Sequence, residues 1–211
     1  LLITFKGDSE TVRLLMSANA SLPFLYLTTE NKVSPSVAPN FCMVLRKYIG
    51  NGRIVEIKQM DFERVIRFKI EHLDELRDLA YKYLYIEIMG KHSNIIFCNE
   101  QDVIIDSIKH ISAQVSSIRE VLPGRTYFIP SQENKLNPLE VNETHFQTQV
   151  FSKPLSLYQA IFQSFVGISP MIAMELCYRV QLDADASCQS LTKKQKNDLW
   201  EQFAQCIEQI K

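Results

Sequence analysis

The sequence predicts an α+β protein in which a β-rich domain is followed by a small helical module. Short runs of alternating or β-branched residues, separated by polar turns, recur through residues 1–150. From residue 151 to 211, apolar side chains instead recur three and four positions apart, as in amphipathic helices. A chain of 211 residues has room for one large domain or two small ones.

The first part of the chain predicts extended segments and then a helix. The expected strands are 1–5, 12–16 and 22–27, with a turn at residues 6–9 and a loop at 31–39. Residues 41–49 have helical spacing, with Asn40 as the expected N-cap and Gly50 as the expected end. The side chains expected on its buried face are Phe41, Val44, Leu45 and Tyr48.

The middle of the chain predicts two strands and then a hairpin. Residues 53–58 and 65–70 alternate as half-buried strands do, whereas residues 73–83 are ambiguous. In the stretch from Tyr85 to Phe97, two apolar runs flank a Met-Gly-Lys-His-Ser-Asn turn, so we expect a hairpin with Lys91 and His92 at its rim. Further expectations are a strand at 103–108, a Pro-Gly turn at 123–124 and a linker at 131–138.

The formal net charge of −1 does not indicate a nucleic-acid-binding protein, so such a function requires local charge. Residues 46–69 hold seven basic and three acidic residues. This excess is compatible with the solvated outer face of a sheet. It is equally compatible with a basic groove that attracts polyanions.

Several classes of function lack support in the sequence. The five cysteines are widely spaced without a C-x-x-C pair, which indicates free core thiols in a reducing compartment. The four histidines have no metal-ligand spacing, so neither a metal nor a cofactor is expected. No P-loop, dinucleotide fingerprint, H-E-x-x-H or G-x-S-x-G motif occurs. The apolar runs are too short to span a bilayer, and a start without Met indicates a fragment.

Three helices are expected in the last part of the chain. The first places Leu157, Ala160, Ile161 and Phe165 on one face. Residues 166–170 break the helix, with Ser169 as the expected cap and Pro170 as the first residue of the next helix. The apolar stripes of the last two helices are expected to hold Ile172, Ala173, Leu176, Val180, Leu199, Phe203, Cys206 and Ile210.

Four stretches in order closely resemble the N-terminal domain of the NFACT family, whose bacterial members are called fibronectin-binding protein A or RqcH. These stretches are 41–47, 87–96, 106–110 and 121–124. The resemblance covers the chain from about residue 1 to its end. It implies a first domain like the N-terminal domain of formamidopyrimidine-DNA glycosylase, without the glycosylase chemistry, so no enzyme activity is expected. It also implies a helix-hairpin-helix module with its turn at 165–170.

The resemblance implies a function in ribosome-associated quality control. Family members bind the large ribosomal subunit carrying a stalled nascent chain and recruit alanyl-tRNA, which adds an alanine tail. Expected partners are therefore tRNA and the large ribosomal subunit, in the cytoplasm. The family's Asp-Arg pair, which matters for tRNA recruitment, corresponds here to Glu63 and Arg64, with an acid one methylene longer.

Six further residues complete the predicted RNA-contacting set, because their side chains carry or can acquire positive charge. They are Arg46, Lys47, Arg53, Lys91, His92 and Lys109. If binding runs through these groups, affinity for RNA should fall steeply as salt rises.

Two other interpretations stay open. One is a cell-surface adhesin for fibronectin or fibrinogen, as some family members are described, although no sortase signal, secretion signal or cysteine framework favours it. The other is an active DNA glycosylase, which requires an N-terminal nucleophile that this sequence does not show.

Overall fold

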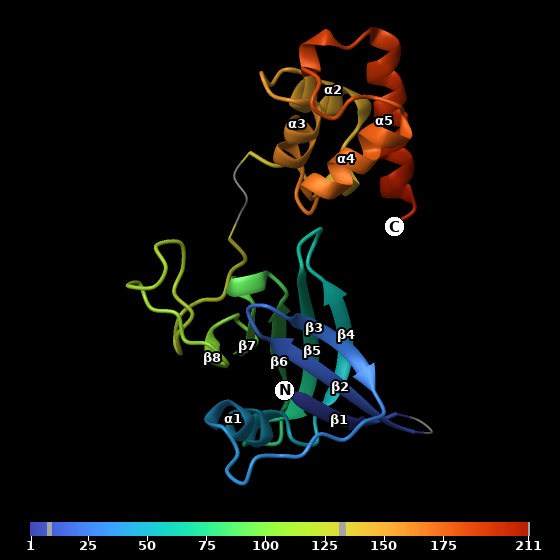
Figure 1. Cartoon of the computed structure of the whole chain (residues 1–211). Coiled ribbons are helices and arrows are strands. Elements are labelled where there is room, and N and C mark those ends of the chain that lie inside the picture. Colours follow the sequence, from blue (N-terminus) through green and yellow to red (C-terminus); the bar gives the residue numbers. More distant parts are fainter. Residues whose placement is uncertain (8–9, 131–133, 211) are drawn as a thin grey trace. The chain divides into compact units, whose positions relative to one another are not determined.

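The computed structural model describes residues 1–7, 10–130 and 134–210. The chain divides into two compact units (Figure 1). The first comprises Leu1–Met60 and Arg64–Pro130, and the second comprises Asp61–Glu63 and Ser131–Lys211. The described strands lie in the first unit together with one α-helix, and the other α-helices lie in the second unit, which agrees with the predicted α+β class. The glycosylase-like fold and the helix-hairpin-helix assignment stay predictions.

A three-stranded antiparallel sheet opens the first unit. Its strands, in order, are β1 (Leu2–Lys6), β2 (Thr11–Ala18) and β3 (Pro23–Thr28). This confirms the expected pairing of the first strands. The predicted turn at residues 6–9 is described only in part, because Asp8 and Ser9 lie outside the described residues.

A five-stranded antiparallel sheet follows, with its strands in chain order. They are β4 (Arg53–Gln59), β5 (Val65–Leu73), β6 (Leu79–Glu87), β7 (Asn94–Cys98) and β8 (Ile104–Ser107). The ambiguous stretch 73–83 is a tight turn followed by the start of β6. Oδ1 of Asp74 accepts from the N–H groups of Leu76 (2.9 Å) and Asp78 (2.8 Å), which closes the turn.

Each face of the larger sheet is partly covered by its own hydrophobic core. Phe68, Leu84 and Phe97 are aligned in register across three strands and pack in one core with the smaller sheet and the helix α1 (Asn40–Ile49). On the opposite face, Tyr85 and Ile96 pack in a second core with segments of the 103–130 region. The region after β8 therefore serves as a cover for the sheet.

Strand β4 departs from its expected half-burial. Every residue of β4 except the half-buried Ile54 is exposed, with Val55 at 41% and Ile57 at 61%, so neither face of this strand is covered well. The reason is position, because β4 is the edge of the sheet and pairs only with β5. Alternation of apolar and polar residues identified a strand here, but it did not identify a buried face.

The expected cap of α1 is wrong. Pro39 is the N-cap and no side chain caps the helix, while Asn40 already lies inside it. The Asn40 side chain instead donates from Nδ2 to Oδ2 of Asp106 at 3.2 Å, because a buried carboxylate needs donors. Gly50 ends the helix as expected, and Phe41 forms part of its buried face.

The second unit begins earlier than expected. Residues 134–150, which the sequence pattern places in the first domain, contribute a 3₁₀ turn η2 (Pro138–Glu140) and most of helix α2 (Glu143–Phe151) to the second unit. Phe146 of α2 is fully buried and stacks on Phe165, with ring centroids 5.6 Å apart. Because only Phe146 and Val150 of α2 are buried, its apolar spacing gave little helical signal.

The remaining helices of the second unit lie where the sequence predicts them. They are α3 (Leu157–Ser164), α4 (Pro170–Arg179) and α5 (Lys193–Glu208), with a short turn η3 (Cys188–Ser190) before α5. The buried stripe of α4 is narrower than expected, because the predicted Ile172 is 42% exposed whereas Ala173 and Leu176 are buried. All four residues predicted for the buried face around α3 are buried. At the last turn of α5, Ile207 is buried, whereas the predicted Ile210 is 55% exposed and Cys206 is half-buried.

The five cysteines are free, and Cys98, Cys177 and Cys188 are buried, as expected of core thiols. Burial raises the pKa of Cys177 to about 12 and also raises the pKa of Cys98, so both stay protonated and unreactive near neutral pH. Within the described residues, no helix has the length and apolarity to cross a membrane. The same residues contain no group of three or more side chains suited to hold a metal ion.

We expect Ser169→Ala to lower the free energy of unfolding by about 1 kcal/mol, because the Ser169 hydroxyl caps α4 by accepting from the N–H of Ile172 at 3.2 Å. The matched control is Ser156→Ala at the start of α3. There the serine makes no capping bond, and its buried Oγ has no partner among the described residues. That control should change stability by less than about 0.5 kcal/mol in urea denaturation. Equal losses would contradict the capping role.

Candidate nucleic-acid interface

The loop between β6 and β7 presents two basic side chains to solvent. It contains a single 3₁₀ turn, η1 (Gly90–His92), in which Gly90 has a φ of +57° that suits glycine best. Lys91 and His92 are exposed, which confirms the predicted hairpin with both residues at its rim. We refer to Lys91 and His92 as the basic tip.

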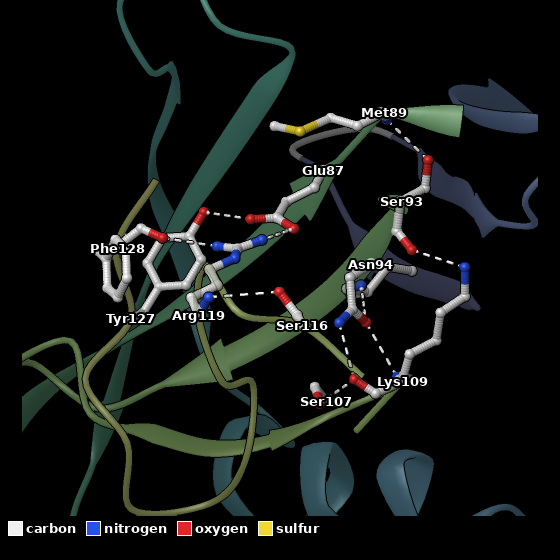
Figure 2. A network of polar contacts seen from close by, with 11 residues as sticks. Glu87, Met89, Ser93, Asn94, Ser107, Lys109, Ser116, Arg119, Tyr127 and Phe128 are labelled. Carbon is white, nitrogen blue, oxygen red and sulfur yellow. Dashed lines mark hydrogen bonds and ion pairs between the residues drawn. The ribbon is translucent and has the colours of Figure 1, made fainter. Parts of the chain in front are cut away.

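A buried polar frame fixes the loop that carries the basic tip (Figure 2). Oγ of Ser93 accepts from the N–H of Met89 at 2.8 Å and ties the two ends of the loop together. The Asn94 side chain joins β7 to the segment after β8, because it donates to the carbonyl of Lys109 (2.9 Å) and accepts from its N–H (3.0 Å). Ser107 donates to the same carbonyl at 2.9 Å.

Lys109 belongs to this frame rather than to the exposed tip. The side chain is partly buried, and its Nζ donates to the carbonyl of Ser93 at 2.8 Å (Figure 2). An ammonium group has three donors, so this bond leaves only part of its hydrogen-bonding capacity for a ligand. The structure therefore brings the predicted contact residue Lys109 close to the basic tip, but in a supporting position.

A buried ion pair anchors the other side of the loop. Glu87, the last residue of β6, is fully buried and pairs with the guanidinium of Arg119. Arg119 also donates to the carbonyl of Phe128 at 2.6 Å, and the Tyr127 hydroxyl donates to Glu87 at 3.0 Å (Figure 2). Burial, together with the Glu87 carboxylate, raises the pKa of Tyr127, so the phenol stays a neutral donor.

Sequence reasoning did not single out Glu87 and Arg119 as partners. They are separated by 32 positions, and nothing in their spacing links them. Glu87 alone could have been recognised from the sequence, because an acid at the end of an apolar strand is expected to be buried and to need a partner.

Asp106 organises a second polar group at the start of α1. Its carboxylate is buried and accepts from Asn40, from the N–H of Ser107 (2.8 Å) and from the His110 ring at 2.7 Å. Strands β6, β7 and β8 are neighbours in the sheet. The stretches 87–96 and 106–110, two of the four that carry the family resemblance, therefore lie side by side in the structure. Most of their polar side chains hold the backbone in place.

Arg64 lies beside the first of these two stretches. Its carbonyl accepts from the N–H of Ile88 at 2.9 Å, which places the residue next to the loop that carries the basic tip. The Arg64 side chain is exposed. Glu63 is half-buried and belongs to the second unit. Of the predicted residues, Arg64, Lys91 and His92 therefore share one end of the sheet as exposed groups.

The other three predicted cations lie apart from this end. Arg53 pairs with Glu71 at 2.7 Å, at the far end of β5 from Arg64. Arg46 and Lys47 are exposed in the last turn of α1. The basic excess predicted over 46–69 is therefore spread along the sheet and α1, and it does not gather in one groove.

The whole chain, residues 1–211, matches the family described as NFACT N-terminal and middle domains. The chain belongs to the NFACT family. The protein named Rqc2 homolog RqcH from Bacillus subtilis (strain 168) is 38% identical over 181 residues, which cover 85% of this chain and 31% of that protein. The archaeal Rqc2 homolog aRqcH from Methanocaldococcus jannaschii is 32% identical over 185 residues, which cover 85% of this chain and 24% of that protein. This NFACT chain thus spans at most about a third of the length of these relatives.

Solved structures resemble the NFACT chain over nearly its full length. The fibrinogen binding protein from Staphylococcus aureus superposes with a TM-score of 0.82 at 28% identity, covering 100% of this chain and 70% of that one. The N-terminal part of the fibronectin/fibrinogen-binding protein from Streptococcus suis gives a TM-score of 0.78 at 31% identity, covering 98% and 72%.

We expect Arg119→Met to lower the free energy of unfolding by about 3–5 kcal/mol, because it strips a fully buried carboxylate of its cation. The matched control is Arg53→Met, which breaks an ion pair whose arginine side chain is 75% exposed and should cost less than about 1 kcal/mol. Urea denaturation of both variants measures the difference. Similar small losses for the two would show that Glu87 does not depend on Arg119.

Proposed function

We propose that this chain is the RNA-binding module of a ribosome-associated quality-control factor. In this proposal the factor binds the large ribosomal subunit with a stalled nascent chain and recruits alanyl-tRNA for alanine tailing. The module binds RNA and catalyses no reaction itself. Membership of the NFACT family and likeness to proteins named Rqc2 homologs support the proposal. The observation that carries it is the gathering of Arg64, Lys91 and His92 as exposed groups at one end of a sheet.

The arrangement of these three side chains suits phosphate recognition. None of them forms an ion pair with a carboxylate in the part of the chain that the structure describes, so the charges of Arg64 and Lys91 are available to a polyanion and the His92 ring is available as a hydrogen-bond donor. The frame of Ser93 and Asn94 holds the loop in place before a ligand arrives, which reduces the ordering cost of binding. Arginine additionally matches phosphate geometry with its planar fork.

The first experiment is sedimentation of the protein with isolated large ribosomal subunits and with purified tRNA. Co-sedimentation that salt weakens supports the proposal, because phosphate contacts release counterions. Absence of binding to both would overturn it.

A second candidate function is adhesion to fibronectin or fibrinogen. The observation that favours it is the similarity to structures described as a fibrinogen binding protein and a fibronectin/fibrinogen-binding protein. Plate binding to immobilised fibronectin and fibrinogen tests it. Saturable binding that is insensitive to competing tRNA would support a surface separate from the RNA site.

We expect Arg64→Ala to weaken tRNA binding at physiological salt and to leave the melting temperature unchanged, because the Arg64 side chain is exposed. Loss of one phosphate contact should reduce the slope of log affinity against log salt by about 0.7–0.9. The control is Arg53→Ala, whose guanidinium is already paired with Glu71. Filter binding across a salt series measures both variants, and an unchanged slope for Arg64→Ala would remove it from the site.

Glu63 tests whether the acid of the pair acts through its charge. If charge alone matters, Glu63→Asp should bind tRNA like the parent and Glu63→Gln should bind more weakly, because only the first keeps a carboxylate. A purely structural role predicts a lower melting temperature for Glu63→Gln with unchanged affinity. Measuring affinity and melting on both variants decides, and equal affinity for the parent and Glu63→Gln would exclude Glu63 from the site.

A further inference from the structure

Four lysines gather in the second unit where α2 ends and α5 begins. Nζ of Lys196 lies 5.0 Å from the ring centre of Phe151, the last residue of α2. Lys153 follows Phe151 by two positions, and Lys193 stands one turn before Lys196 on α5. Lys135 is close enough to act electrostatically on Lys153. We refer to Lys135, Lys153, Lys193 and Lys196 as the lysine cluster.

The charges of the lysine cluster are not neutralised within the described residues, where none of the four lysines forms an ion pair. The Lys153 ammonium instead donates to the neutral hydroxyl of Ser164 at 2.5 Å. Burial and the charge of Lys135 both lower the pKa of Lys153, so bringing these cations together costs free energy.

The stability of α5 does not explain the lysines in its first turn. Positive charges there oppose the helix dipole, which favours acids, and no acid occupies that turn. The helix start is held by another device, a capping box in which Thr192 accepts from the N–H of Gln195 (3.3 Å) and the Gln195 side chain accepts from the N–H of Thr192 (2.9 Å). The lysines are therefore an electrostatic cost to the fold that an anionic partner would offset.

We propose that the lysine cluster is a second surface for the phosphate backbone of RNA, located on the helical unit. The proposal rests on the function proposed above and assigns it a second binding element. Its members come from three separate segments, namely the chain before η2, the segment that follows α2 and the first turn of α5. Such a spread suits a polymer with repeated phosphates better than a single small anion.

The test is a double variant, Lys193→Gln with Lys196→Gln, in the complete chain. Purified bulk tRNA and isolated large ribosomal subunits serve as separate probes, and binding is measured across a salt series. Removal of two contacts should reduce the slope of log affinity against log salt by about 1.4–1.8. The matched control is Arg179→Gln in the same unit, whose guanidinium is paired with Glu175 at 2.8 Å and should leave the slope unchanged.

A second double variant separates binding from folding. Lys196 covers the Phe151 ring, so its loss also alters packing, whereas Lys135→Gln with Lys193→Gln leaves that contact intact. Both double variants should show a smaller slope of log affinity against log salt than the parent. The second should also keep the melting temperature of the parent. A loss seen with tRNA alone, or with subunits alone, supports the surface and identifies which RNA it contacts.

The outcomes distinguish the two proposals. If the parent binds either probe and both double variants keep its full slope, the lysine cluster is overturned while the proposed function stands. If the parent binds neither probe, the proposed function and the lysine cluster fall together.

Discussion

The buried carboxylate of Glu87 is the constraint on which the architecture of the first unit depends. An ionised acid without solvent requires a cation and further donors, and Arg119 and Tyr127 supply them from a segment far along the chain. To reach Glu87, that segment must cross the face of the larger sheet. In doing so it covers Tyr85 and Ile96 with apolar side chains of its own. The segment that supplies the partners of Glu87 therefore also completes the second hydrophobic core.

The same constraint determines where positive charge reaches solvent. Because Glu87 ends β6, the loop that follows leaves the sheet from a fixed point. Asn94 sits opposite Glu87 in the register and fixes the return of the chain into β7. The turn between these two anchors reaches solvent, and it carries the exposed Lys91 and His92. Glu87 is buried and does not contact a ligand itself, but it helps to fix the position of the exposed Lys91 and His92.

Most strands and helices could be predicted from apolar spacing, because that spacing records burial directly. Prediction failed where burial depends on position in the fold, as for Ile57 on an edge strand and for α2, in which few side chains face the core. It failed again where a polar side chain had two options, since Asn40 bonds a distant carboxylate instead of capping its own helix. Lys91 and His92 could be predicted as exposed bases, but the frame beneath them depends on pairs such as Glu87 and Arg119 that no local pattern connects.

Pairing, rather than net charge, separates structural cations from those available to a ligand. The sequence holds 23 basic and 24 acidic residues, so its overall field does not favour RNA. Yet Arg53, Arg67 and Arg125 each lie within 2.8 Å of a carboxylate oxygen. Within the described part of the chain, the carboxylates that pair with these arginines do not form ion pairs with the cations proposed to contact RNA. Screening confines surface fields to about 8–10 Å at physiological salt, so a polyanion senses the local group and not the molecular total. Arg64, the basic tip and the lysine cluster can therefore attract phosphate on a chain of nearly zero net charge.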